Sequence, residues 1–436
     1  MTASAAAPAL EPEALYGEPN ALARHYSRFR VAERLLLTGH SHQAWPDCGF
    51  DGQRRAWEDA ARLVDAKWEE AFARADRVRA GFAALLGAPG QPDGGDYALG
   101  GSTHELVIRF LSALSLRARP RLVTTDGEFH SIRRQLERLE EEGLAVSRVA
   151  TDPIDSLSER LCRAADDRTA GVLVSAVLYR DARIVPGLGR VAEACDRVGA
   201  PLLVDAYHAL DAIPFDLSRL GLEGAFVVGG GYKYCQLGEG NCFLRIPPGC
   251  DLRPAVTGWF AEFSALGAAA GEGRVRYGPG AERFAGSTYD PTSHYRAAGV
   301  FAFFDRHGLA PAFLRAVSRH QVDRLASGFD ALDVDPRLIE RDRETPLEAV
   351  GGFLALRTPW AGAFHEALAA RGVATDFRDD LLRLGPAPYL SDRQLDDAVS
   401  ALGEAAHSVW NGYACAVLSS VRRPQKVKPA ATPPIT

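Results

Sequence analysis

The sequence predicts an α/β protein, with a large domain built on a mainly parallel sheet and a smaller α+β domain. From about residue 76 to 250, segments that are apolar throughout alternate with amphipathic helical segments. This alternation is typical of a parallel sheet covered by helices on both faces. After Pro291 the pattern changes to long helices and short strands. The 436 residues, 47% of them hydrophobic, are enough for one large core or two medium ones.

The predicted elements follow in chain order. In the large domain we expect strands at residues 97–99, 121–124, 145–150, 171–176, 202–205 and 225–228. A helix follows each of the first four strands, beginning near Thr103 and then spanning 131–142, 156–165 and 188–198. In the small domain we expect helices at 294–306, 311–330, 361–371 and 392–409, a strand at 352–357, and short strands near Val373 and Leu382.

The predicted domain boundaries follow from these elements. We expect a disordered N-terminus at residues 1–14, a segment at 15–75 that joins the small domain, the large domain at 76–290, the small domain at 291–420, and a disordered tail at 421–436. Both ends are rich in proline, and the N-terminal end is also rich in alanine, a composition typical of disordered termini.

The composition favours a small-molecule substrate over a macromolecular partner. The net charge is −6, and basic residues are scattered among acidic ones, which argues against nucleic-acid binding. No apolar run approaches the roughly 20 residues that span a membrane, and no signal peptide is recognisable. The seven cysteines show neither metal-ligand spacing nor a pairing pattern, so we expect no metal and a reduced, cytoplasmic protein.

One lysine stands out. The chain has four lysines against 46 arginines, and Lys233 is the only lysine between Trp68 and Gln425. Arginine stays charged, whereas a desolvated lysine can lose its proton and become a nucleophilic amine. A codon bias that disfavours lysine is the alternative explanation. The sequence around Lys233 favours the chemical role.

Several chemical features fall at the ends of predicted strands, where open parallel sheets bind ligands. The run Gly100-Gly101-Ser102-Thr103-His104-Glu105 turns from a strand into a helix, and its free N–H groups suit a phosphate; a capping box is the alternative. Asp205 ends an apolar strand, where a carboxylate needs a cation or a strong donor such as a protonated pyridine, unless it only holds the next loop. Phe129 and Ser131 follow another strand and suit a planar ring, unless they serve core packing and a helix cap.

The order of these features resembles the pyridoxal phosphate site of fold type I enzymes. The segment VDAYHALDAIPFDLSRLGLEGAFVVGGGYKY is similar to the aspartate-to-lysine segment of class V aminotransferase-type enzymes. Within that class the chain is most similar to kynureninase-like proteins, through Tyr232-Lys233-Tyr234, Gly258-Trp259-Phe260 and the arginine segment TDFRDDLLRLGPAP. The similarity spans roughly residues 30–405 and implies a seven-stranded, mainly parallel sheet and a homodimer with shared active sites.

The resemblance also implies a role for each site residue. Lys233 would bond to the cofactor aldehyde and later move the substrate's α-proton, Asp205 would pair with the pyridine nitrogen, and His208 would lie beside the ring. Arg383 would bind the substrate carboxylate, unless it forms a surface ion pair with Asp379 or Asp380. The remaining cofactor contacts implied are Ser102, Thr103, Phe129, Ser131, Ser175 and Tyr232, with Trp259, Ser287 and Thr288 reaching the phosphate of the other subunit.

The part of the site that would bind the distal group of the substrate differs from that of kynureninase. The segment Gly39-His40-Ser41-His42-Gln43 replaces that family's Asn-Ser-Leu-Gly run, and His104 stands where it has asparagine. We interpret His40 and His104 as candidate substrate-binding or acid–base residues, with His42 and His130 as further candidates. Satisfied polar or core histidines are the alternative.

The implied function is that of a pyridoxal phosphate enzyme acting on an L-α-amino acid. It would remove the α-proton and cleave at Cβ, by kynureninase-like hydrolysis or by β-elimination of the C–S lyase type. An aminotransferase or a decarboxylating deaminase is the alternative. Cysteine desulfurase is disfavoured, because no cysteine lies between Cys250 and Cys415 to act from a small-domain loop. A non-catalytic member of the fold is disfavoured by the joint presence of Lys233, Asp205, His208 and Arg383.

Overall fold

The large domain is built on a seven-stranded sheet. The computed structural model describes residues 10–88, 97–267 and 273–421. The strands stand in the order β2 (Tyr97–Gly100), β8 (Cys242–Arg245), β7 (Phe226–Gly230), β6 (Leu202–Asp205), β5 (Thr169–Ser175), β3 (Arg121–Thr125) and β4 (Ala145–Val149). Only β8 runs against its neighbours, so the sheet is mainly parallel, as predicted.

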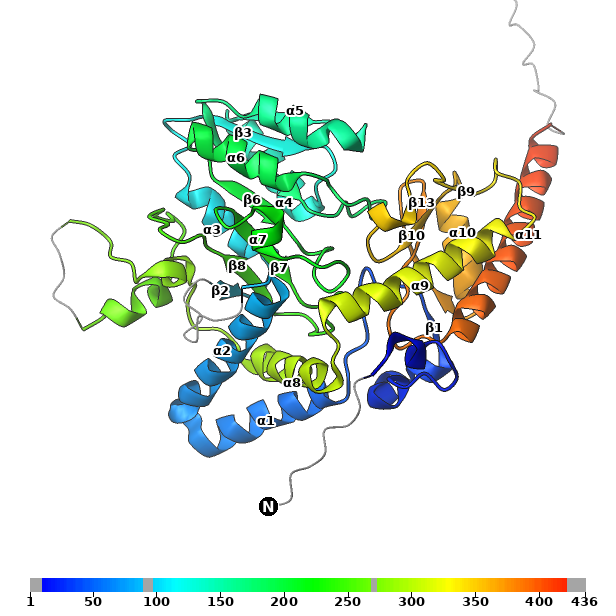
Figure 1. The fold of residues 1–436 in the computed structure, drawn as a ribbon, viewed down its shortest axis with the longest axis horizontal. Helices are drawn as coiled ribbons and strands as arrows, with labels where there is room; N and C mark the ends of the chain where they lie inside the picture. Colours follow the sequence, from blue (N-terminus) through cyan, green and yellow to red (C-terminus); the bar gives the residue numbers. More distant parts are fainter. Residues whose placement is uncertain (1–9, 89–96, 268–272, 422–436) are drawn as a thin grey trace, which may run out of the picture.

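Helices cover both faces of this sheet (Figure 1). Apolar residues of α3 (Thr103–Ala113) and α4 (His130–Glu141) pack in one core with Leu203, and those of α5 (Leu157–Ala164) and α6 (Leu188–Val198) pack in the other with Val204. Successive residues of a strand point to opposite faces, so strands buried on both sides must be apolar throughout. The apolar runs in the sequence therefore located six of the seven strands, and β8 was not predicted.

Three helices and a projecting segment complete this half of the molecule. Helices α1 (Cys48–Leu63), α2 (Lys67–Leu85) and α8 (Thr292–His307) pack together along its lower edge in Figure 1. After β8 the chain projects away from the sheet, at the left of Figure 1, and carries the short helices η6 (Trp259–Ala265) and η7 (Gly280–Phe284).

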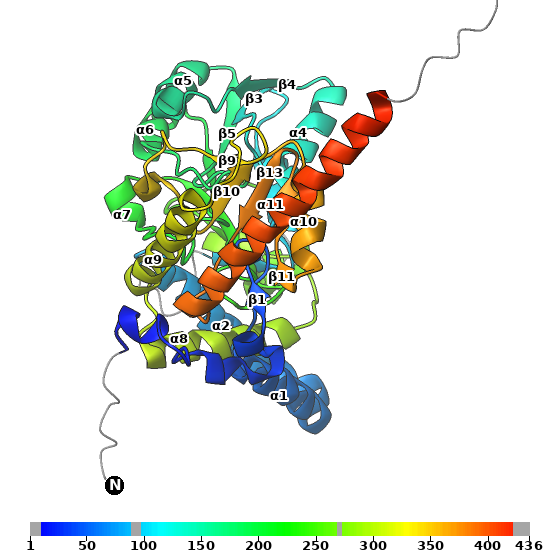
Figure 2. The same ribbon diagram turned by 90° about the vertical axis from the view of Figure 1, so that its right-hand side faces the viewer.

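The smaller half contains a four-stranded antiparallel sheet. Its order is β12 (Asp376–Arg378), β13 (Leu381–Leu384), β10 (Leu354–Arg357) and β9 (Glu340–Arg341). Helices α9 (Pro311–Asp330), α10 (Ala361–Ala369) and α11 (Asp392–Val421) accompany it, and Figure 2 shows α11 running along its outer side. Strand β13 places Arg383 opposite both Ala355 and Asp376, which matters for the site.

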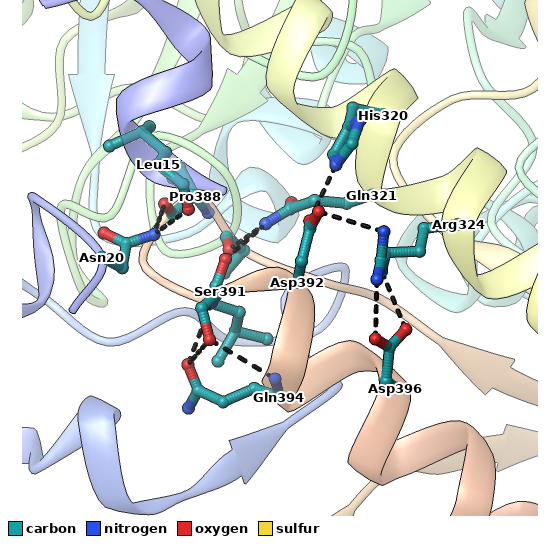
Figure 3. Close-up of polar contacts among 12 residues, drawn as sticks. Leu15, Asn20, His320, Gln321, Arg324, Pro388, Ser391, Asp392, Gln394 and Asp396 are labelled. Carbon is teal, nitrogen blue, oxygen red and sulfur yellow. Dashed lines mark hydrogen bonds and ion pairs between the residues drawn. The ribbon is translucent and has the colours of Figure 1, made fainter. Parts of the chain in front are cut away.

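The N-terminal segment is attached to the smaller half. Strand β1 (Leu35–Leu36) pairs in parallel with β11 (Val373–Ala374). The Asn20 Nδ2 atom donates hydrogen bonds to the carbonyl oxygens of Leu15 and Pro388, at 2.7 and 2.9 Å (Figure 3). In the same view His320 and Arg324 of α9 contact Asp392 at the start of α11. These contacts fix the path by which the segment carries residues 39–43 to the sheet edge.

Some expectations need correction. The disorder expected for residues 1–14 does not reach η1 (Pro12–Leu15), because Leu15 is buried in the core; residues 1–9, and the tail after Val421, lie outside the described residues. Helix α11 continues twelve residues beyond the predicted end. Strand β1 and η1 pack on the smaller half, and α1 and α2 pack on α8, which lies within the predicted small domain, so the segment expected at 15–75 stays a prediction. The other domain boundaries stay predictions.

The helices carry no sign of a membrane span. Over the described ranges, none is both long and apolar enough to cross a bilayer.

Candidate active site

A cavity of about 280 Å³ opens at the carboxyl ends of the parallel strands. Chain reversals at the ends of five strands supply its walls, which is why residues far apart in the sequence meet there. Ten predicted site residues line it: Ser102, Thr103, His104, Phe129, Ser131, Ser175, Asp205, His208, Tyr232 and Lys233. Val177, Tyr179, Tyr207, Glu239 and Cys242 also line it and were not predicted.

Lys233 lies in the loop that follows β7 and is 6% exposed. Its Nζ atom lies 2.6 Å from His208 Nε2 and 4.9 Å from the centre of the Tyr207 ring. Burial lowers the pKa of Lys233 to about 7, although the Asp205 carboxylate acts in the opposite direction. A large fraction of this amine is therefore neutral and nucleophilic near neutral pH.

Asp205 and His208 lie at the start of and within a tight turn that follows β6. The Asp205 Oδ1 atom accepts a hydrogen bond from the backbone N–H of Tyr207 at 2.8 Å, so the carboxylate caps this turn and lines the cavity at the same time. Burial raises the pKa of Asp205, opposed by that hydrogen bond and by Lys233. Burial holds the pKa of His208 well below its ordinary value, so its ring is neutral.

The first turn of α3 forms the opposite end of the cavity. Ser102 is the N-cap residue, and its Oγ atom accepts a hydrogen bond from the Glu105 backbone N–H at 3.3 Å. The Glu105 side chain contacts Arg109 instead of closing a capping box. The remaining N–H groups of the turn, together with the positive end of the helix dipole, give this end an affinity for anions.

Arg383 is buried, which rules out the alternative of a surface pair with Asp379 or Asp380. Its Nε and Nη2 atoms donate to the two oxygens of Asp376 at 2.8 and 2.6 Å, and Nη1 donates to the Tyr179 carbonyl. Burial opposes ionisation of Asp376, but hydrogen bonds from His40 and Arg383 hold its pKa well below its ordinary range. Asp376 is thus a site residue that motif reasoning missed.

His40 is not an acid or base for neutral pH. Its ring is fully buried, its Nε2 atom lies 2.8 Å from Asp376 Oδ1, and burial lowers its pKa to about 4. The expectation that it titrates near neutrality is wrong, because desolvation outweighs its contact with Asp376. Since Asp376 is an acceptor, the proton of this neutral ring sits on Nε2.

The other candidate histidines lie nearer the surface. His104 lines the cavity from the first turn of α3, in an exposed position. His42 stacks on the Tyr232 ring, with 4.7 Å between ring centroids. His130 lies beside Tyr179 and Arg133. Of these three, only His104 belongs to the cavity wall.

The residues expected to act on a second subunit lie apart from the first cavity. Trp259 is 48% exposed, and its Nε1 atom donates to Thr288 Oγ1 at 3.3 Å. Ser287 and Thr288 line a larger cavity of about 920 Å³ that shares Gly101 and Gly240 with the first. Glu105, in the first turn of α3, also lines the larger cavity, whereas Trp259 lines neither cavity.

Known proteins resemble this chain in part of its sequence and in its fold. Residues 333–402 match the family model of the kynureninase C-terminal domain. The fold is similar to that of the cystine C-S lyase C-DES, with a TM-score of 0.73 and 14% identity over 86% of this chain and 98% of that one. The fold of a cysteine desulfurase from Thermococcus onnurineus NA1 is similar with a TM-score of 0.69 and 16% identity, covering 86% of this chain and 95% of that one. The chain shares the fold of these two proteins.

A curated relative agrees with this assignment. The uncharacterized aminotransferase YcbU of Bacillus subtilis (strain 168) is 24% identical over 353 residues, which is 79% of this chain and 87% of YcbU. Another class V structure, a lysine-to-alanine mutant of C-DES, carries glycine covalently linked to its PLP cofactor; it has a TM-score of 0.74 and 13% identity, over 87% of this chain and 98% of that one. The predicted fold class is confirmed.

Proposed function

We propose that this chain is a pyridoxal phosphate enzyme that removes the α-proton of an L-α-amino acid and cleaves the substrate at Cβ. One observation carries the proposal: the buried amine of Lys233, with its pKa lowered to about 7, shares a cavity with the Asp205 carboxylate and the anion-binding end of α3. An aldehyde cofactor with an anionic arm and a basic ring nitrogen needs these three groups.

The residues fit the cofactor end to end. Ser102 and Thr103 would hold the phosphate at the first turn of α3, helped by Tyr232. Phe129 would stack on the ring, since it already faces Lys233 with 5.4 Å between Nζ and the ring centre. Asp205 would meet the pyridine nitrogen, whose proton would satisfy a carboxylate that burial otherwise disfavours.

The chain's own groups then supply the acid–base chemistry. When bound, pyridoxal phosphate provides an electron sink for negative charge at the substrate Cα. Lys233, a large fraction of which is neutral near pH 7, would accept the α-proton and deliver it to another atom in a later step. His208, held neutral by burial, contacts Lys233 Nζ and orients it. His104 stands at the cavity wall, where a group leaving from Cβ would need a proton.

Arg383 retains capacity for a substrate carboxylate. A guanidinium has five N–H donors, and Asp376 with the Tyr179 carbonyl occupies three of them. One N–H on each terminal nitrogen remains for a ligand. Asp376 thus holds the guanidinium, and these remaining N–H groups would bind the α-carboxylate.

The cysteines argue against a persulfide formed on a cysteine of this chain. Cys242 lines the cavity, but burial raises its pKa to about 12, so it stays a thiol rather than a nucleophilic thiolate. No cysteine occurs between Cys250 and Cys415. The similarity to the C–S lyase C-DES and to the kynureninase C-terminal domain favours cleavage at Cβ. The similarity to YcbU keeps aminotransfer as the second candidate.

We further propose that the protein works as a homodimer. Trp259 lies on the projecting segment, and Ser287 and Thr288 line the larger cavity but not the first one. A second copy that brings these groups to the phosphate would complete each site. The exposed Trp259 and Phe263 would be buried by that contact.

Product analysis tests the reaction. The purified protein, loaded with pyridoxal phosphate, is incubated with kynurenine, 3-hydroxykynurenine and cysteine S-conjugates, and the products are identified by mass spectrometry. Cleaved products such as anthranilate, or pyruvate with a thiol, support the proposal. A keto acid formed only in step with conversion of the cofactor to its amine form would establish aminotransfer instead.

A further inference from the structure

A carboxyl group outside the cavity lining lies directly behind the site. Glu128, in the turn between β3 and α4, is 2% exposed. Its Oε1 atom accepts hydrogen bonds from Thr125 Oγ1 at 2.6 Å and from the Ser175 backbone N–H at 3.2 Å, and its Oε2 atom accepts one from Ser175 Oγ at 2.6 Å. Ser175 ends β5, pairs in register with Asp205 and lines the cavity. Glu128 therefore reaches the site through the Ser175 hydroxyl.

These contacts fix the direction in which each hydroxyl points. Thr125 Oγ1 accepts a hydrogen bond from the Gly127 backbone N–H at 3.2 Å, so its own proton is directed at Glu128. A hydroxyl has one proton and two lone pairs. Because Ser175 donates its proton to Glu128, it has only lone pairs left for a ligand in the cavity.

We propose that Glu128 is a positioning residue that makes Ser175 a hydrogen-bond acceptor toward the bound cofactor, so that the cofactor group facing Ser175 is held in its protonated form. That group is an N–H or O–H on the heteroaromatic ring or its substituents. The inference rests on the proposed function for the identity of the ligand. The direction of the Ser175 hydroxyl rests on the protein alone.

The charges around Glu128 make this arrangement sensitive to pH. Burial raises the pKa of Glu128 to about 7, against the hydrogen bonds from Ser175 and Thr125, and the Asp205 carboxylate on β6 raises it further. On its own segment, Asp126 is turned to the Thr151 backbone N–H and His130 to Arg133. A proton on Glu128 Oε2 would be donated to Ser175 Oγ, and the Ser175 proton would then turn toward the cavity.

A single substitution inverts the direction of the hydroxyl while keeping the shape of the side chain. In Glu128→Gln the Ser175 backbone N–H still requires an acceptor, so the amide oxygen takes the Oε1 position. The amide nitrogen then faces Ser175 Oγ and donates to it, which turns the Ser175 proton into the cavity. Ser175→Ala leaves Glu128 charged but removes the hydroxyl that links it to the ligand by hydrogen bonds.

The measurement is a pH titration of the absorbance of bound pyridoxal phosphate, in the wild type, Glu128→Gln, Ser175→Ala and the double variant. We expect Glu128→Gln to lower the apparent pKa of the spectral transition by about one pH unit, a tenfold change in proton affinity, as loss of one hydrogen bond from a charged group implies. In the Ser175→Ala background the same substitution should produce no shift.

Each outcome decides the matter. An unshifted transition in Glu128→Gln overturns the proposal, and an equal shift in both backgrounds also overturns it, because Glu128 would then act by its charge alone. A wild type that binds no pyridoxal phosphate would refute the proposed function instead. Thermal unfolding of the cofactor-free variants checks that each one is folded. In that form, infrared spectroscopy should show a carboxylate that becomes protonated as the pH falls through about 7 in the wild type and that is absent in Glu128→Gln.

Discussion

At the scale of single residues, the site depends on desolvation. Three groups lie in one buried cluster: an amine whose pKa falls to about 7, a carboxylate whose pKa rises, and a histidine that stays neutral. Each shift has burial as its largest cause, and the mutual attraction of Lys233 and Asp205 only reduces it. A ligand that neutralises these groups or hydrogen-bonds to them would therefore offset the desolvation cost of the cluster.

The lowered pKa of Lys233 predicts a pH profile for cofactor capture. An ordinary lysine has a pKa of 10.5, so its neutral fraction would rise only in alkaline solution. For Lys233 the rate of borohydride-trapped pyridoxal phosphate incorporation should rise as pH passes through about 7 and then level off. The measurement is the initial rate of incorporation from about pH 5 to pH 9.

Glu128 has a pKa in the same range, so the profile is repeated in Glu128→Gln. A profile that keeps its midpoint in this variant assigns the titration to Lys233. A rate still climbing at pH 9 would contradict the lowered pKa.

At the scale of secondary-structure elements, the sequence located most strands of the large sheet and the residues at their ends. It did not reveal the strand pairing in the small domain that brings Asp376 to Arg383. Periodicity and apolar runs reveal strands such as β5 and β6, because both faces of these strands are buried. They do not reveal that β12 and β13 pair so that Asp376 stands opposite Arg383. That register depends on a contact between strands, and so does the burial of His40 beneath it.

Glu128 was missed for a related reason. Its role follows from the closeness of Glu128, just after β3, to Ser175 at the end of β5, which lies 47 residues further along the chain. In the sequence it is one acidic residue beside Phe129, and no spacing rule distinguishes it from a solvated side chain.

The pairing of β12 and β13 predicts a large effect of Asp376→Ala on stability. The substitution leaves the Arg383 guanidinium, whose side chain is 4% exposed, without its bidentate partner. Breaking a buried pair by removing one member costs roughly 3 kcal/mol or more. The free energy of unfolding from urea denaturation should fall by about this amount.

A matched control uses a nearby carboxylate. Asp379, 72% exposed and 3.6 Å from Arg180, should cost less than about 1 kcal/mol when replaced by alanine. Equal losses for Asp376→Ala and Asp379→Ala would refute the structural role assigned to Asp376.

At the scale of the whole molecule, the two halves and the N-terminal segment converge on one site. The large sheet supplies the amine and the anion-binding turn that line the cavity. Arg383 of the small sheet contacts the cavity residue Tyr179, and His40, on the segment attached through Asn20 and β1, shares Asp376 with Arg383. On the projecting segment that carries η6, Trp259 and Phe263 stay 48% and 45% exposed in a single copy.

The proposed dimer predicts that charges on the projecting segment separate the subunits. In Trp259→Asp with Phe263→Asp, sedimentation should show a monomer at concentrations where the wild type is a dimer, since charges do not tolerate burial in an interface. Affinity for pyridoxal phosphate should fall as well, because each phosphate would lose contacts from the other subunit.

Trp57 provides the control for this experiment. It is 79% exposed on α1, away from the projecting segment, and Trp57→Asp should leave both the mass and the affinity unchanged. A dimer that survives the double substitution would place the interface elsewhere.

The scarcity of lysine gives the central claim its most direct test. The wild type, loaded with pyridoxal phosphate, is reduced with borohydride and digested, and the modified peptide is sequenced by mass spectrometry. The account predicts one cofactor mass on Lys233, and none in Lys233→Arg. A cofactor mass on Lys67, Lys426 or Lys428 but not on Lys233, or on no lysine at all, would contradict it.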